Sequence, residues 1–154
     1  MKYNSIEILT KEDSGSEPVS LAEAKTHLYI TGTDHDTYLT FLIKACRQEI
    51  EGIYNISLVG KTIIGRIRNQ LGSQALLYPP IASINSLVTL EGEEIDFDET
   101  NLILDAVFDY GVIEYETEAV VSEGYKFRVL ELLANKFANR GDAQKPKNKG
   151  TWII

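Results

Sequence analysis

The sequence predicts a mainly helical α+β fold, in which an N-terminal helical pair and a long C-terminal helix form a small bundle with an inserted antiparallel β section of short strands. Two observations predict it. Capped starts and apolar residues at three- and four-residue spacing indicate helices at about 20–30, 34–54 and 122–140. Between them, at about 61–116, alternating runs separated by turn residues indicate strands.

The first predicted helix begins at Ser20. The Ser20 hydroxyl can accept a hydrogen bond from the amide of Glu23, and the Glu23 carboxylate can reach back to the amide of Ser20. The polar turn that follows ends this helix, because Gly32 can adopt a positive φ. The same turn offers a side-chain oxygen of Thr33 or Asp34 to cap the next helix.

The second predicted helix is amphipathic, so we expect one of its faces to be buried. Its apolar stripe includes a single acid and consists of Tyr38, Leu39, Leu42, Ala45, Cys46, Glu49, Ile50 and Ile53. Cys46 is the only cysteine in the sequence, so no internal disulfide can form. We interpret it as a small buried hydrophobe in a protein of a reducing compartment.

The predicted β section opens with Lys61–Arg68, which alternates as a strand with one wet face. Ala75–Tyr78 ends at Pro79-Pro80, which cannot donate to a β ladder and therefore closes a strand or lies on an edge. A hairpin turn at Glu91-Gly92-Glu93 separates two further short strands. The remaining strands are predicted at 84–90, 94–97, 101–104 and 111–115.

Both ends of the sequence are predicted to lie outside the single domain at 18–141. Residues 1–17 are polar and contain the joint Ser14-Gly15-Ser16, so we expect a flexible arm or, at most, an edge strand over 5–9. Residues 142–154 are predicted to form an extended tail, because their composition cannot offset the entropy of ordering.

Charge is segregated along these 154 residues, whose net charge is −8. Between Asn69 and Tyr125 there are twelve acids but no lysine or arginine, whereas the segment after Asn139 is basic. This pattern suits an assembly that pairs one region with the other or leaves the acids facing a lumen. No run approaches the ~20 apolar residues of a bilayer-spanning helix, and we expect a soluble, unexported protein.

The residues that could carry chemistry are few. Asp34-His35-Asp36 are consecutive, so their side chains diverge, and we interpret them as helix-capping residues and not as a metal site. His27, the only other histidine, is interpreted as a packing residue. Phosphate-loop, serine-elbow and zinc motifs are missing from the sequence. We therefore predict no catalytic, cofactor or metal residues and no enzyme activity.

Four segments carry a family resemblance through their order along the sequence. They are Pro18–Leu28, the acidic turn and second helix at 34–58, Tyr78–Val88 with its double proline, and the closing helix at 130–140 with its Asn-Arg end. Together they resemble the gp6-like head-tail connector, or adaptor, family of tailed bacteriophages. The resemblance spans about Glu17 to Asp142.

The resemblance implies a structural virion protein that forms a ring of about twelve copies. Such a ring lies in the neck beneath the portal protein, surrounds the DNA channel and offers an attachment surface to a tail or stopper protein. It implies assembly in the host cytoplasm, passage of DNA without sequence-specific binding, and no cofactor or membrane partner.

Two sets of residues are candidate interaction sites. The tail is predicted to order on the portal or a neighbouring copy through Lys145, Lys147, Lys149, Trp152, Ile153 and Ile154. An acidic loop region is hypothesised to face the channel or the tail side, where it would repel DNA phosphates. Its residues are Glu91, Glu93, Glu94, Asp96, Asp98 and Glu99.

Three other functions remain open at this point. A small nucleic-acid-binding protein could use the basic tail, with binding that falls steeply with salt. A tail-completion or stopper protein would occupy another level of the neck. A hydrolase built on Asp34–Asp36 or on the acidic middle of the chain would need a nucleophile or base that the sequence does not identify.

Overall fold

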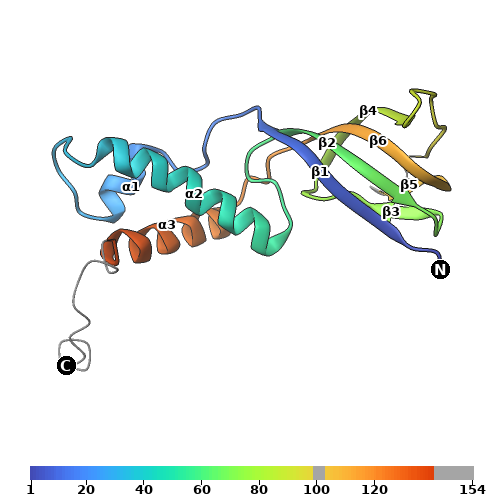
Figure 1. Ribbon diagram of the computed structural model, residues 1–154. Helices are drawn as coiled ribbons and strands as arrows, with labels where there is room; N and C mark the ends of the chain where they lie inside the picture. Colours follow the sequence, from blue (N-terminus) through green and yellow to red (C-terminus); the bar gives the residue numbers. More distant parts are fainter. Residues whose placement is uncertain (99–102, 141–154) are drawn as a thin grey trace.

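Helices and strands occupy opposite ends of an elongated molecule in the computed structural model, which describes residues 1–98 and 103–140 (Figure 1). The helical end holds three helices, and the strand end holds a four-stranded sheet and a two-stranded ribbon. In chain order the elements are β1 (Asn4–Asp13), α1 (Leu21–His27), α2 (Asp36–Tyr54), β2 (Lys61–Asn69), β3 (Ser73–Ala75), β4 (Ile81–Thr89), β5 (Ile103–Asp105), β6 (Phe108–Thr117) and α3 (Glu123–Ala138).

The prediction of a mainly helical fold that opens on a helical pair is wrong. Helices and strands contain nearly equal numbers of residues, and a strand precedes the first helix. The strands β2, β4 and β6 are long, not short. Sequence patterning underestimates them because their apolar runs are interrupted by the buried glycines Gly65 and Gly111 and by serine and charged residues.

The segment predicted as a flexible arm contains β1, which pairs with β2 from Asn4 opposite Asn69 to Asp13 opposite Lys61. The edge strand that we allowed at 5–9 is therefore about twice as long. A strand at a sheet edge needs few apolar residues, because one of its sides lies in solvent. Ile6 and Ile8 are its half-buried contacts with the strand core, and its other residues are largely polar.

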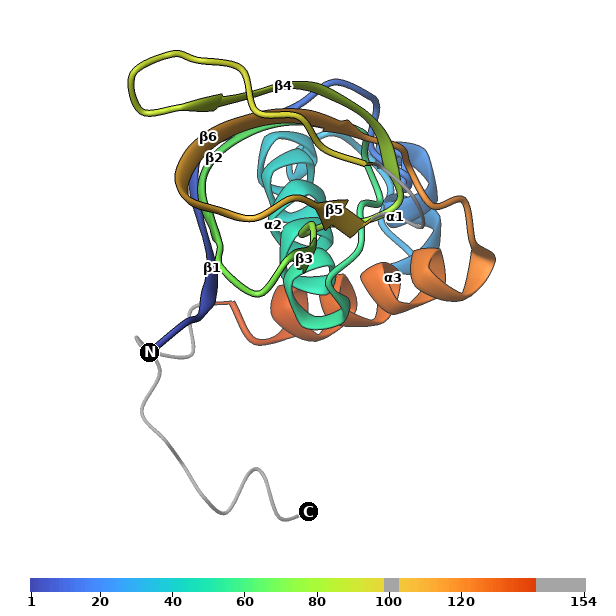
Figure 2. The same ribbon diagram turned by 90° about the vertical axis from the view of Figure 1, so that its right-hand side faces the viewer.

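The four-stranded sheet is antiparallel, in the order β1-β2-β6-β4, and the β3–β5 ribbon lies on the concave side of its curve (Figure 2). Apolar side chains from the inner face of the sheet and from the ribbon region form a buried cluster, the strand core. Its members are Ile63, Ile67, Leu76, Leu87, Leu104, Ile113 and Tyr115.

The predicted strand at 94–97 is reduced to a single bridge between Val88 and Glu94. The turn at Gly92, which has φ +90°, brings the chain back beside β4, and the amide of Ile95 donates to the carbonyl of Leu87 at 3.0 Å. The predicted strand at 101–104 lies partly outside the described residues.

The three helices enclose a second buried cluster, the helical core, at the other end of the molecule. It comprises Val19, Ala24, Leu39, Leu42, Ile43, Cys46, Ile50, Leu58, Val129 and Leu133. The apolar stripe predicted for the second helix supplies Leu39, Leu42, Cys46 and Ile50, whereas Ile53 of that stripe is 64% exposed.

The caps of these helices match the predictions in part. The Ser20 hydroxyl accepts from the Glu23 amide at 3.1 Å, as predicted, but the Glu23 carboxylate pairs with Lys126 of α3 at 2.8 Å. At the start of α2, His35 occupies the N-cap without a side-chain capping bond, so the predicted capping by Thr33 or Asp34 is wrong.

Candidate functional site

The predicted site residues that the structure describes lie in the acidic hairpin, which we define as residues 90–98, directly after β4. Glu91, Glu93, Glu94, Asp96 and Asp98 are all exposed there. The predicted tail residues Lys145, Lys147, Lys149, Trp152, Ile153 and Ile154, together with Glu99, lie outside the described residues.

Successive side chains of the extended segment 94–98 point to opposite faces, which places the acids of this segment in solvent. Ile95 and Phe97 pack against the strand core, so the residues between and beside them, Glu94, Asp96 and Asp98, face outward. The turn itself is closed by two backbone bonds, from Gly92 to Thr89 at 2.9 Å and from Thr89 to Glu93 at 2.7 Å. The hairpin therefore presents its acids from an ordered support.

The neighbouring strand β6 extends this negative surface. Glu116 is exposed on the outer face, where its carboxylate accepts from the Ser83 hydroxyl of β4 at 3.3 Å, and Glu114 is two residues away on the same face. β4, the hairpin and β6 contain no lysine or arginine, so the negative charges of Glu114, Glu116 and the hairpin add, whereas Asp109 of β6 is paired with Arg68 of β2 at 3.2 Å. Such a surface repels DNA phosphates.

The residues considered for catalysis are engaged in structural contacts. Asp36 pairs with Lys25 at 2.8 Å, and the ring of His35 packs edge-on against Phe137 with centroids 5.4 Å apart. The His27 ring makes a similar contact with Phe127 at 6.5 Å. In the described part of the chain, no three potential metal ligands gather in one place.

Cys46 is fully buried in the helical core, as we interpreted it. Burial raises the pKa of its thiol to about 11, with smaller opposing effects from Lys136 and Glu49. At neutral pH the side chain is therefore a protonated, inaccessible thiol and not a nucleophile.

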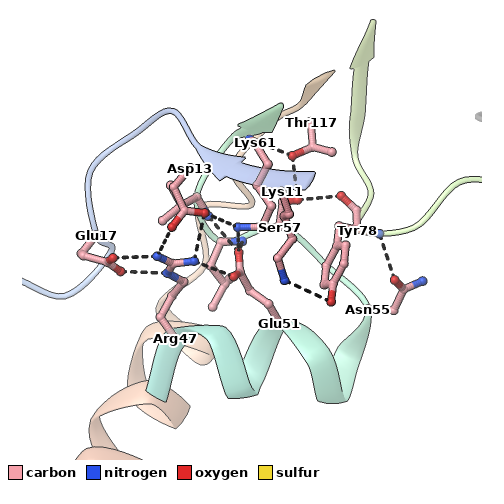
Figure 3. A network of polar contacts seen from close by, with 12 residues as sticks. Lys11, Asp13, Glu17, Arg47, Glu51, Asn55, Ser57, Lys61, Tyr78 and Thr117 are labelled. Carbon is pink, nitrogen blue, oxygen red and sulfur yellow. Dashed lines mark hydrogen bonds and ion pairs between the residues drawn. The ribbon is translucent and has the colours of Figure 1, made fainter. Parts of the chain in front are cut away.

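Sequence reasoning missed a buried ionic network at the junction of the two ends, which we call the ionic joint (Figure 3). Its members come from β1, the following linker, α2 and β2, and they are Asp13, Glu17, Arg47, Glu51 and Lys61. Arg47, Glu51 and Lys61 are at most 1% exposed. Arg47 and Glu51 are four residues apart beside the apolar stripe of α2, which is the one sequence signal that could have indicated them.

Arg47 is the centre of the joint. Its guanidinium holds Glu17 through two bonds of 2.9 and 2.7 Å, Asp13 at 2.6 Å and Glu51 at 2.8 Å. Burial alone would lower the pKa of Arg47, but the hydrogen bonds that its guanidinium donates to these three carboxylates outweigh this effect and raise the pKa. The guanidinium therefore stays charged.

Lys61 completes the joint from the sheet side. Its ammonium contacts Glu51 at 2.7 Å and Asp13 at 3.0 Å, so each of these acids bridges two buried cations. Burial raises the pKa of Asp13, but bonds from Arg47 and Lys61 lower it more, and the net pKa lies below its ordinary value. Glu51 also accepts from the backbone amide of Leu58 at 2.8 Å.

A second, uncharged set of bonds connects the end of α2 and the segment after it to Tyr78, which precedes β4, and to β6. The Ser57 hydroxyl donates to the Tyr78 carbonyl at 2.6 Å and lies 2.8 Å from the Thr117 hydroxyl of β6. Asn55, which ends α2 with φ +50°, accepts from the Tyr78 amide at 2.9 Å (Figure 3). Polar contacts therefore fix the helices against the sheet.

Comparison with known proteins identifies the family. The model of the phage gp6-like head-tail connector protein family matches residues 18–151. The chain belongs to this family. Among curated proteins, no sequence matches this connector.

Solved structures with a similar fold come from gene transfer agent (GTA) particles. The connector is 19% identical to a chain in the virion of the native particle, with a TM-score of 0.62 and coverage of 86% of both chains. A neck chain of the empty particle, computed with C6 symmetry, gives 18% identity and 0.62, and a neck chain of the native particle, computed with C12 symmetry, gives 17% and 0.61. Each match covers 86% of this connector and 85% of the neck chain.

None of the three helices in the described residues is both long and apolar enough to cross a membrane.

Proposed function

We propose that this connector is a non-enzymatic building block of the neck of a phage-like particle, where about twelve copies form a ring around the DNA channel. Family membership and the likeness to neck chains of particles with C6 and C12 symmetry support it. The ring assembles in the host cytoplasm and connects the portal above to a tail or stopper protein below.

The observation that carries this proposal is the two-ended shape of the connector. The C-terminal end of α3 lies at the helical end of the molecule, and the acidic hairpin lies at the other end (Figure 1). The residue at which α3 ends, Ala138, and the acidic hairpin are thus separated along the long axis. We propose that the helical end faces the portal and the strand end faces the tail side.

At the portal side, the tail anchors the ring. Lys145, Lys147 and Lys149 supply positive charge, and Trp152, Ile153 and Ile154 supply apolar anchors. Buried aromatic anchors in protein interfaces commonly contribute about 2 kcal/mol or more when truncated. Deletion of Lys149–Ile154 is therefore expected to abolish docking on the portal and to leave the folded domain intact.

At the strand end, the acidic hairpin lies near the path of DNA or of the tail protein. The negative charge of its exposed acids keeps DNA from adhering as it passes, because like charges repel across distances shorter than the screening length. The connector thus lines the channel without binding a DNA sequence.

Native mass spectrometry of the connector, alone and with the portal protein of its own particle, tests the proposal. The expected result is a ring of connector chains on the portal, with copy number near twelve. A connector that stays an inert monomer in the presence of the portal contradicts it. Circular dichroism of the truncated chain separates loss of docking from loss of folding.

A further inference from the structure

Phe41 is a large apolar side chain on the solvent face of α2. Five other residues of α2 face the helical core, and Phe41 lies on the opposite side of the helix with 69% of its surface exposed. Its neighbours on that face are exposed and polar: Thr37, Lys44 and Gln48. A single exposed aromatic ring is common on protein surfaces. Phe41 therefore indicates a contact only if the surface also offers a site that can bind it.

A matching site lies between α1 and α3. A groove of about 430 Å³ opens there, lined by Ala22, Glu23, Thr26, His27, Lys126 and Leu130. The small side chains of Ala22 and Thr26, one helical turn apart on α1, leave room beside Leu130 of α3. Next to Lys126, Phe127 is 54% exposed and packs edge-on with His27, which adds an aromatic rim.

The exposed ring and the groove lie on opposite faces of the bundle. The buried face of α2 packs against both α1 and α3, so its solvent face points away from the groove that these two helices form. In Figure 2, which looks along the molecule, α2 lies on one side and α1 and α3 lie on the other.

We propose that the groove between α1 and α3 binds Phe41 of a second copy of this connector. The proposal rests on the proposed ring, because a closed ring of one chain needs two different and complementary faces on every subunit. The occupant is a second copy because both halves of the contact are present on each chain, on opposite faces. Burial of Phe41 in an apolar groove supplies the central contact between subunits.

Cross-linking of assembled rings tests the contact directly. A chain carrying Lys44→Cys, one helical turn from Phe41 on the same exposed face, and Thr26→Cys keeps Phe41 in place. It is assembled on the portal and treated with a bismaleimide that spans about 10 Å, a distance that adjacent side chains satisfy. The expected result is a ladder of covalent oligomers up to the full ring. Cys46 can stay in place, because it is fully buried. The control replaces Thr26→Cys by Glu131→Cys, which lies on α3 outside the groove and should give no ladder.

A pair of variants measures the effect on assembly. Phe41→Ala should lower the fraction of chains in rings by at least about tenfold at equal concentration, whereas Gln48→Ala, on the same exposed face, should change it by less than about twofold. Thr26→Trp, which fills the groove, should act like Phe41→Ala. All three positions are exposed, and unchanged circular dichroism will show that the fold is retained.

The outcomes separate this inference from the proposed function. Rings on the portal that yield no ladder from the chain with both cysteine substitutions, or rings that form normally with Phe41→Ala, overturn the contact and leave the connector function standing. Cross-linking that stops at dimers shows a two-fold contact and also overturns it. Failure of the unmodified chain to form a ring overturns the proposed function itself.

Discussion

At the helical end of the connector, two acids are paired with bases on neighbouring helices, whereas at the strand end four acids of the hairpin, Glu91, Glu93, Glu94 and Asp96, form no ion pair within the described residues. Glu23 pairs with Lys126 at 2.8 Å, and Glu49 pairs with Lys136 at 3.0 Å. The charge of these four hairpin acids is left to solvent or to a partner, which is where a function by electrostatics is expected.

The junction between the two ends differs from both. Each end has an apolar core, but the elements that connect them meet through the ionic joint and the Ser57–Tyr78–Thr117 contacts. Buried ion pairs add little net stability compared with apolar packing, because desolvation offsets their attraction. They do require one geometry, since any other leaves a charge buried without a partner. We infer that the joint sets the angle between helices and sheet.

The largest expected effect comes from breaking this joint. Glu51→Ala leaves Arg47 and Lys61 buried with fewer partners and removes the acceptor of the Leu58 amide, so the free energy of unfolding should fall by about 3–5 kcal/mol. Urea denaturation measures the change. Glu49→Ala, two residues away on α2 and part of an exposed pair, should produce no measurable change. Equal effects of the two substitutions would show that the joint is unimportant.

A cavity in the helical core should have a slightly smaller effect. Leu133→Ala removes a fully buried side chain and should cost about 2–5 kcal/mol in unfolding free energy. If the joint couples the two ends, separate spectroscopic probes of helix and strand should still report one unfolding transition. The matched substitution Leu90→Ala, at a site 57% exposed on the acidic hairpin, should change stability by less than about 0.5 kcal/mol. Two separate transitions would show that the ends fold independently.

Acid should weaken the joint through Asp13. Because the folded-state pKa of Asp13 lies below its ordinary value of 3.8, its contribution to stability is present above that value and is lost as the pH falls through the folded-state pKa. The difference in stability between the unmodified chain and Asp13→Asn should therefore be largest near neutral pH and should narrow below 3.8. A difference that is the same at every pH would contradict the assigned cause.

The smallest effect on stability is expected at the acidic hairpin. Replacing Glu91, Glu93, Glu94 and Asp96 by their amides should leave the free energy of unfolding within about 0.5 kcal/mol, because these side chains are exposed. DNA retention by assembled rings should rise at low salt, and DNA ejection from particles should slow. If ejection is unchanged, the hairpin does not act on DNA in the channel.

Local signals in the sequence identify parts of this architecture. The Ser20 cap, the apolar stripe of α2 and the turn at Gly92 each depend on residues close together in the chain, and each is present. The ordered resemblance to gp6-like connectors is also visible in the sequence, and it is confirmed by the family match. The acids of the hairpin can be identified from the sequence, because the charge of a side chain can be assigned without knowing the fold.

Other features depend on segments that meet only after folding. In the sequence β1 has the composition of a flexible arm, and it becomes ordered only by pairing with β2, whose residues lie about 50 to 65 positions further along the chain. Arg47, Glu51 and Lys61 resemble ordinary charges until α2, β1 and β2 bury them together. Likewise, Phe41 and the groove between α1 and α3 come to lie on opposite faces only when the three helices pack into a bundle.

The sequence by itself thus determined the start of the first helix, the segregation of charge and the family, since these follow from short-range patterns and composition. Only the tertiary structure decided the balance of strand to helix, the ionic joint and the two faces of the bundle. The physical reason is that burial and pairing are properties of distant segments brought into contact, and a linear pattern does not contain those contacts.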